Sequence, residues 1–99
     1  MIVVKVTYTV KNSFIEQNKQ HIRTFLQDFR ELGRDFRYTV YSQGGTFTHL
    51  SHFKNADIQA AILAVPSFKA FQAARDASGL TGAHHLEVLN LEGSTADIF

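Results

Sequence analysis

Five histidines and three tyrosines are among the side chains of this 99-residue chain that could exchange a proton with a bound molecule. Two of the histidines, His49 and His52, lie three residues apart in the stretch THLSHF. On a helix this spacing would place them on one face, whereas on a strand it sends them to opposite faces. Their chemistry therefore depends on the element that carries them.

The segment 36–53 predicts two strands joined by a turn at the glycine pair 44–45, because glycine tolerates the backbone angles of tight hairpins. After the turn, the residues of 47–53 alternate between the two faces of the strand. His49 and His52 therefore face opposite ways and cannot bind one metal ion together. The adjacent His84 and His85 also point apart on a strand. With no cysteine in the chain, thiolate sites are excluded, and the sequence predicts no metal site.

Three further segments complete the order β-α-β-β-α-β. Alternating valines predict a strand over 2–10, and apolar residues at helical spacing predict a helix within 12–35. In that helix Ser13 and Glu16 fit a capping box, and Gly33 fits a helix end.

A second helical region, over 55–80, begins at the plausible cap Asn55. It is interrupted by Pro66 and can restart at Ser67. Residues 84–93 predict the last strand and 94–99 a short tail. We therefore expect one α+β domain over 1–99 with a ferredoxin-like fold, a four-stranded antiparallel sheet with helices on one face.

Charge and hydropathy exclude several classes of partner. The formal net charge is +1 with no run of like charge, so neither nucleic acid nor an anionic membrane is an expected partner. No apolar stretch approaches the roughly 20 residues of a membrane helix. The N-terminal stretch contains Lys5 and no small-residue cleavage site, which argues against a signal peptide and favours a cytoplasmic protein.

The sheet face away from the helices needs a cover. Its expected residues form a mixed packing surface, namely Val3, Thr7, Tyr41, Leu50 and Val88. A second copy stacked sheet on sheet would cover it, so the sequence predicts a homodimer through the sheet faces.

In its element order, over residues 2–92, the chain resembles the dimeric α/β-barrel superfamily, in the antibiotic-biosynthesis-monooxygenase-like group. The likeness is most specific in FTHLSHFKNADIQAAILAVPSFKAF, through Phe53, Pro66, Phe68 and Phe71. It implies a homodimer whose two sheets close a barrel, with a cavity in each subunit between sheet and helices. Some members oxidise aromatic quinol-like substrates with O₂ and no cofactor, others degrade heme, and many have no assigned activity.

The chain differs from that family at residues on which the activities of its members depend. The heme-degrading branch relies on a cavity tryptophan, a first-strand asparagine and a second-helix histidine. Here there is no tryptophan, Phe53 and Tyr8 stand at the two strand positions, and 56–77 contains no histidine. We therefore do not expect heme degradation. The quinol-oxidising branch often has a histidine on the same helix, where Ile62 and its neighbours are apolar.

If the inward face of the first strand meets the helices, a few polar groups reach the cavity the resemblance implies. His49 could take a proton from a phenol, and Tyr8 or Tyr38 could hydrogen-bond a ligand oxygen. Arg75 could steady an oxyanion, although beside Asp76 near a helix end it is expected to be solvated. The expected wall of the pocket comprises Phe53, Phe68, Phe71 and Arg75, with His21 at its edge.

Two functions of different classes remain open. The first is a cofactor-independent monooxygenase of a small phenol or quinol, with His49 as base. The second is a non-catalytic dimer that binds a small hydrophobic molecule or only assembles as a barrel, because a histidine on an apolar strand is commonly a buried core or interface residue. No cofactor is expected in either case. The strand register, which decides whether Tyr38 or Tyr41 enters the cavity, is also open.

Overall fold

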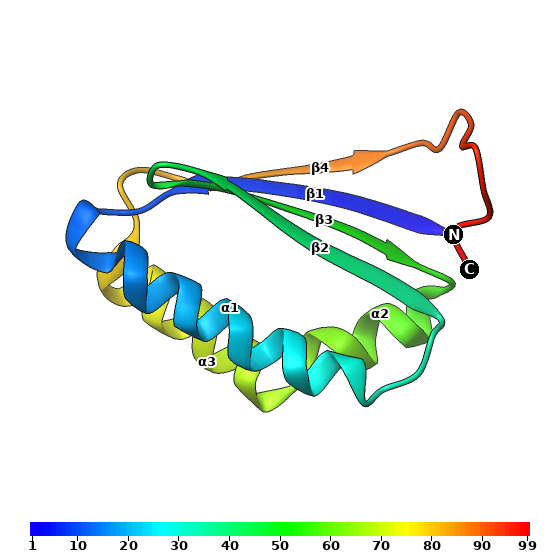
Figure 1. The fold of residues 1–99 in the computed structure, drawn as a ribbon, viewed down its shortest axis with the longest axis horizontal. Helices are drawn as coiled ribbons and strands as arrows, with labels where there is room; N and C mark the ends of the chain where they lie inside the picture. The colour runs from blue at the N-terminus through cyan, green and yellow to red at the C-terminus, as the bar shows by residue number, and fades with distance from the viewer.

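In the computed structural model, which describes residues 1–99, four antiparallel strands form one sheet in the order β2-β3-β1-β4. The strands are β1 (Ile2–Thr9), β2 (Phe36–Gln43), β3 (Thr46–Phe53) and β4 (His85–Leu89). Helices α1 (Ile15–Arg30), α2 (Ala56–Leu63) and α3 (Pro66–Ala74) all lie on one side of the sheet (Figure 1). This architecture confirms the predicted ferredoxin-like fold, with the second helical region divided at Pro66.

The alternation predicted for β3 is confirmed. Every second residue of this strand is buried against the helices, namely Phe47, His49, Ser51 and Phe53. His52 lies on the outer face, opposite Val3 of β1 and Arg37 of β2. His49 and His52 are therefore on opposite sides of the sheet, as the spacing predicted.

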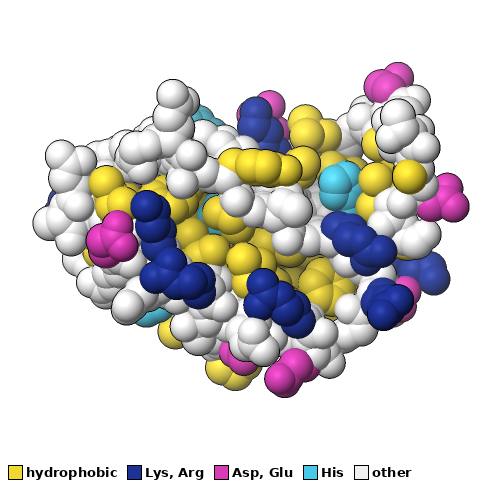
Figure 2. Space-filling model, viewed as in Figure 1, with side chains coloured by type: hydrophobic (Ala, Val, Ile, Leu, Met, Phe, Trp, Pro, Cys, Tyr) yellow, Lys and Arg dark blue, Asp and Glu magenta, His cyan; other side chains and the backbone are white.

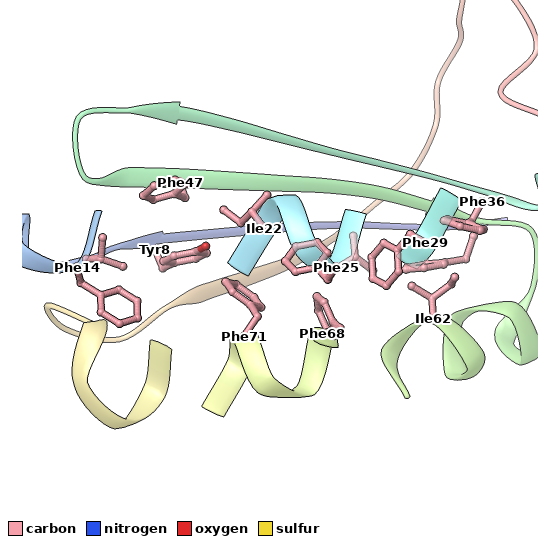
Figure 3. Close-up of a cluster of buried hydrophobic side chains, with 13 residues drawn as sticks. Tyr8, Phe14, Ile22, Phe25, Phe29, Phe36, Phe47, Ile62, Phe68 and Phe71 are labelled. Atoms are coloured by element: carbon pink, nitrogen blue, oxygen red, sulfur yellow. The ribbon is translucent and has the colours of Figure 1, made fainter. Parts of the chain in front are cut away.

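Phenylalanine dominates the core between sheet and helices (Figure 3). The ring of Phe25 from α1 is central: its centroid lies 5.1 Å from that of Phe29, 5.1 Å from Phe68 and 5.0 Å from Phe71. Such tilted and edge-on pairs stabilise a core beyond the burial of area alone. The α1 and α3 helices are thus joined by aromatic packing, which holds the cavity wall described below.

The helix ends differ in part from the sequence predictions. The Asn55 cap of α2 is confirmed, since its Oδ1 accepts the Ile58 N–H at 2.9 Å. The capping box at Ser13 is wrong: α1 follows the 3₁₀ turn η1 (Asn12–Phe14) and begins after Phe14 with no side-chain cap. Phe14 is buried, so packing of its ring decides where this helix starts.

The start of α3 also differs. Val65 precedes the helix and Pro66 occupies its first turn, where a missing N–H has no consequence. Ser67 does not act as a cap; its hydroxyl instead donates to Asp28 Oδ2 at 2.5 Å. That bond joins α3 to α1.

The prediction that Val88 lies on the outer sheet face is wrong. Val88 pairs with Val4, whose side chain faces the helices, so Val88 faces the same way. It is nevertheless 70% exposed, because β4 is an edge strand that the helices do not cover. The residues after β4 return toward the N-terminal end of β1 (Figure 1), and the Phe99 ring lies 5.6 Å from the Arg37 guanidinium carbon.

None of the three α-helices combines the length and the apolar character that crossing a membrane would require.

Candidate active site

A cavity of about 340 Å³ lies between strands β1, β3 and β4 of the sheet and helices α2 and α3. Ten of its 16 lining residues are hydrophobic, with Tyr38 counted among them for its ring, so its interior suits an apolar or aromatic molecule. The polar side chains on its wall are few: Tyr38, His49, Ser51, Gln59, Gln72, Arg75 and His84. No aspartate or glutamate lines it.

Four side chains form a chain of hydrogen bonds that runs from the cavity wall toward α1. Tyr38 Oη lies 2.7 Å from His49 Nδ1, and His49 Nε2 lies 2.8 Å from Tyr8 Oη. Behind Tyr8, Asn18 Nδ2 donates to the same hydroxyl at 3.0 Å. Tyr38 and His49 line the cavity, whereas Tyr8 and Asn18 form a buried second layer.

The sheet register and the stripe of α1 bring these groups together. Tyr38 lies opposite Ser51 on β3, which makes it a diagonal neighbour of His49 on the same face. Asn18 belongs to the buried stripe of α1, four residues before Ile22. The sequence does contain a signal for Asn18, because a polar residue at a position of the apolar stripe is unusual. The prediction of the site did not use it.

All three titratable members of this chain are uncharged at neutral pH. Burial, followed by the nearby charge of Arg75, lowers the pKa of His49 to about 3. Burial raises the pKa of Tyr8 to about 12, although the Asn18 hydrogen bond and Arg75 act in the opposite direction. The pKa of Tyr38 is raised by burial and by Tyr8, again against the charge of Arg75.

A neutral imidazole has one N–H, so one tyrosine hydroxyl donates to His49 and the other accepts from it. In one tautomer Nδ1–H donates to Tyr38, whose own O–H is then free to donate into the cavity. In the other, Tyr38 donates to Nδ1 and offers its oxygen lone pairs to the cavity. The Tyr38 hydroxyl can therefore either donate a hydrogen bond to an acceptor atom of a ligand or accept one from a ligand hydroxyl.

Arg75 is buried, with 5% of its surface exposed, and the expectation that it is solvated is wrong. It continues the buried face of α3 after Phe68 and Phe71, at spacings of three and four, and opens the π-type turn η2 (Arg75–Gly79). Its guanidinium carbon lies 5.1 Å from the Tyr8 ring centroid and 5.3 Å from that of Phe71. These are cation–π distances.

The structure brings six of the predicted site residues to the cavity, namely Tyr38, His49, Phe53, Phe68, Phe71 and Arg75. Tyr8 does not line the cavity itself but contacts three residues that do: its hydroxyl bonds to His49, and its ring faces Phe71 (Figure 3) and the Arg75 guanidinium. His21 is half-buried on α1 and does not line the cavity. Tyr41 is 60% exposed on the outer sheet face, which answers the open question of register in favour of Tyr38.

Two shallower pockets lie between α1 and β2 and share Leu26; one is also lined by Phe29 and Tyr38, and the other by Val40. Figure 2 shows hydrophobic side chains in a hollow on this side of the molecule, bordered by lysine and arginine. Apart from Tyr38, the two pockets offer no buried titratable group. No three histidine, aspartate or glutamate side chains gather as a metal site would require.

Solved structures with the same architecture include several described as antibiotic biosynthesis monooxygenases. One such crystal structure superposes with a TM-score of 0.81 at 12% identity, over 94% of this chain and 100% of that one. A proposed antibiotic biosynthesis monooxygenase from Deinococcus radiodurans gives 0.76 at 16% identity, over 98% of each chain. One from Caulobacter crescentus gives 0.79 at 18%, over 93% of this chain and 90% of that chain.

The chain has the antibiotic-biosynthesis-monooxygenase-like fold. The resemblance stated from the sequence is thereby confirmed at the level of architecture, which does not itself determine an activity. No protein-family profile and no curated protein matches the sequence.

Proposed function

We propose that the protein is a cofactor-independent monooxygenase that oxidises a small phenolic aromatic molecule in the cavity beside His49. The observation that carries this proposal is an apolar cavity whose wall holds a hydrogen-bonded Tyr38–His49 pair and the charge of Arg75. Phe53, Phe68 and Phe71 would contact the aromatic ring of the substrate. Three neighbours in fold described as antibiotic biosynthesis monooxygenases support the same reaction class.

In the proposed reaction, a phenol with a free para position and O₂ give a quinone and water. The hydroxyl proton leaves first, and the phenolate then passes one electron to O₂. The resulting radical pair joins to form a C–O bond at the para carbon. The O–O bond then breaks as the para C–H proton leaves, one oxygen stays in the quinone and the other leaves as water. O₂ accepts all four electrons that the substrate loses.

The residues of the cavity would favour the first step by stabilising the phenolate. Tyr38 Oη would hydrogen-bond the substrate oxygen, and His49 would hold Tyr38 in place at 2.7 Å. His49 is a poor final acceptor of the proton, because its pKa is about 3. A phenol binds its proton far more tightly than such an imidazole does, so transfer of the proton to His49 is unfavourable. The proton must therefore leave to solvent, and a readily ionised substrate suits the site.

The alternative function is non-catalytic binding of a small hydrophobic molecule, or a purely structural barrel. One observation favours it: both ring nitrogens of His49 already have tyrosine partners, and all three groups are neutral. A fully satisfied network of this kind stabilises a core without any proton transfer. The two functions therefore differ in whether Tyr38 takes part in turnover.

Oxygen uptake by the purified, metal-free protein against a panel of phenols and hydroquinones tests the proposal. Tyr38→Phe should lower kcat by about 100-fold, the usual scale of losing one hydrogen-bond donor to a developing oxyanion. Tyr41→Phe is the matched control and should retain wild-type activity, because Tyr41 lies on the opposite face of the sheet. Binding without uptake across the panel would favour the alternative, and uptake unaffected by Tyr38→Phe would contradict the assignment to this cavity.

A further inference from the structure

Arg75 is a buried cation whose hydrogen-bonding capacity is largely unused. A guanidinium has five N–H donors. In Arg75 only the Nε–H has an acceptor in the protein, Asp76 Oδ1 at 3.0 Å. The Asp76 side chain is itself 54% exposed, so its charge is shared with solvent. The two terminal nitrogens have no protein acceptor, although the side chain lines the cavity and is nearly fully buried.

The rest of the cavity does not compensate this charge. None of its lining residues is acidic, and His49 is held neutral by burial. A buried cation with most of its N–H donors unpaired is unfavourable, so an anion bound at the terminal nitrogens would add a second partner to the one that Asp76 already provides. The cavity is therefore selective for negative charge before any substrate chemistry is considered.

The shape of the unused donors indicates which anion. The two terminal nitrogens form a planar pair that matches the two oxygens of a carboxylate, whereas a phenolate has a single oxygen to offer. Gln72, three residues earlier on the same helical face, also lines the cavity and adds an amide donor. A phosphate dianion would need a second cation, and no other lysine or arginine lines the cavity.

We propose that the substrate is a phenol that carries a carboxylate, and that the Arg75 terminal nitrogens bind this carboxylate while the ring lies against Phe68 and Phe71. This inference rests on the proposed function, since it concerns the same cavity. Arg75 then acts as a binding and specificity residue.

A pair of fluorescent ligands tests the subsite on the wild-type protein. 1-Hydroxy-2-naphthoate carries the carboxylate, and 1-naphthol is the same ring system without it. We expect the naphthoate to bind at least about 10-fold more tightly, the scale of one charge-assisted hydrogen-bonded pair. Equal binding of the two, or tighter binding of 1-naphthol, would overturn the carboxylate subsite.

Substitutions of Arg75 test whether this residue is responsible for the preference for the naphthoate. Arg75→Met keeps much of the apolar stem and should lower naphthoate affinity about 10-fold or more, while 1-naphthol affinity changes by less than about twofold. Arg75→Lys should retain part of the preference, because it restores the charge without the planar pair. Arg34→Met, at an exposed position outside the cavity, is the control and should bind like the wild type. Circular dichroism confirms that each variant is folded.

The outcomes separate this inference from the proposed function. If 1-naphthol binds and is oxidised but the naphthoate has no advantage, the subsite is wrong and the monooxygenase proposal stands. If the naphthoate preference is present and depends on Arg75 but no oxygen is consumed, the subsite stands in a binding protein. If neither ligand binds, both are contradicted.

Discussion

At the scale of single residues, the hydrogen-bonded chain from Tyr38 to Asn18 connects stability to function. Each of its inner members is buried, so every bond it makes or lacks contributes to the free energy of unfolding. Asn18 is the weak point, because its buried Oδ1 has no hydrogen-bond partner. Tyr8 is the strong point, because its hydroxyl serves both Asn18 and His49.

Replacing these two residues should therefore have unequal effects. Asn18→Leu removes one bond but also removes the unpaired Oδ1, so we expect a change in unfolding free energy below about 1 kcal/mol. Tyr8→Phe leaves Asn18 and His49 Nε2 without partners and should destabilise by about 2–4 kcal/mol. Urea denaturation of both variants measures the difference. A larger loss for Asn18→Leu than for Tyr8→Phe would contradict the assigned hydrogen bonds.

His49 predicts a pH dependence of stability. Its pKa falls from 6.5 in the unfolded chain to about 3 in the folded protein, so between these pH values the unfolded state binds more protons. Stability due to this residue is complete above pH 6.5 and is lost as the pH falls toward 3. From pH 6.5 to 4.5 the loss should be about 2 kcal/mol.

His49→Gln removes this titration, and the comparison of its unfolding free energy with that of the wild type at several pH values isolates the contribution. The wild-type curve should be steeper between pH 6.5 and 4.5. Parallel curves for the two proteins would show that His49 is not held neutral by burial.

The sequence predicted which side of the sheet His49 faces, but not its hydrogen-bond partners. The period of two on β3 decides that His49 points inward, and this was predicted. That both ring nitrogens are bonded depends on the pairing of β2 with β3, which a pattern within one strand does not contain. Arg75 was predicted at the pocket wall, but the expectation that it is solvated was wrong: its charge suggested solvent, whereas its spacing from Phe68 and Phe71 places it on the buried face.

At the scale of elements, the turn η2 holds Arg75 against the core. The Leu80 N–H donates to the Arg75 carbonyl at 3.1 Å, and the Lys11 N–H donates to the Gly79 carbonyl at 2.8 Å. A Cβ on Gly79 would lie 2.6 Å from the ring of the buried Phe14. The absence of a side chain at Gly79 thus lets the turn pack closely, and the turn in turn positions the guanidinium.

We expect Gly79→Ala to destabilise the fold by about 1–3 kcal/mol, as overpacking of a core commonly does. Because the clash would displace η2, the affinity for 1-hydroxy-2-naphthoate should also fall. Gly93→Ala is the control: a Cβ there meets no atom within 4 Å, and neither property should change. Thermal unfolding and ligand titration check the pair, and equal behaviour of the two variants would contradict this role of Gly79.

Element types were predictable because local pattern decides them, whereas several boundaries were not. The capping signal at Ser13 was overridden by burial of the Phe14 ring, a tertiary contact with Gly79. Val88 was assigned to the wrong sheet face because the phase of a short, exposed edge strand is set by its pairing with β1 rather than by burial.

At the scale of the whole molecule, we propose that the chain is one domain that pairs with a second copy through the outer sheet face. That face carries Leu50 and the exposed Tyr41, and Val3 is buried on it. Sheet-on-sheet packing would cover Leu50 and Tyr41 at the usual separation of about 10 Å. The same arrangement leaves each cavity within its own subunit, on the helix side.

Sedimentation velocity should show a species of twice the chain mass, and Leu50→Glu should convert it to a monomer by burying a charge in the interface. Leu86→Glu, on the helix side of the sheet and 60% exposed, is the control and should not affect association. A wild-type monomer, or dissociation caused by Leu86→Glu alone, would contradict the proposed interface.

The central claim, that this cavity oxidises a phenol with O₂, is tested most directly by the fate of the oxygen atoms. The wild-type protein is incubated with 1-hydroxy-2-naphthoate under ¹⁸O₂, and the product is analysed by mass spectrometry. We expect a quinone with one labelled oxygen atom, formed about 100-fold more slowly by Tyr38→Phe than by Tyr41→Phe. Bound but unchanged naphthoate, or a quinone without the label, would contradict it.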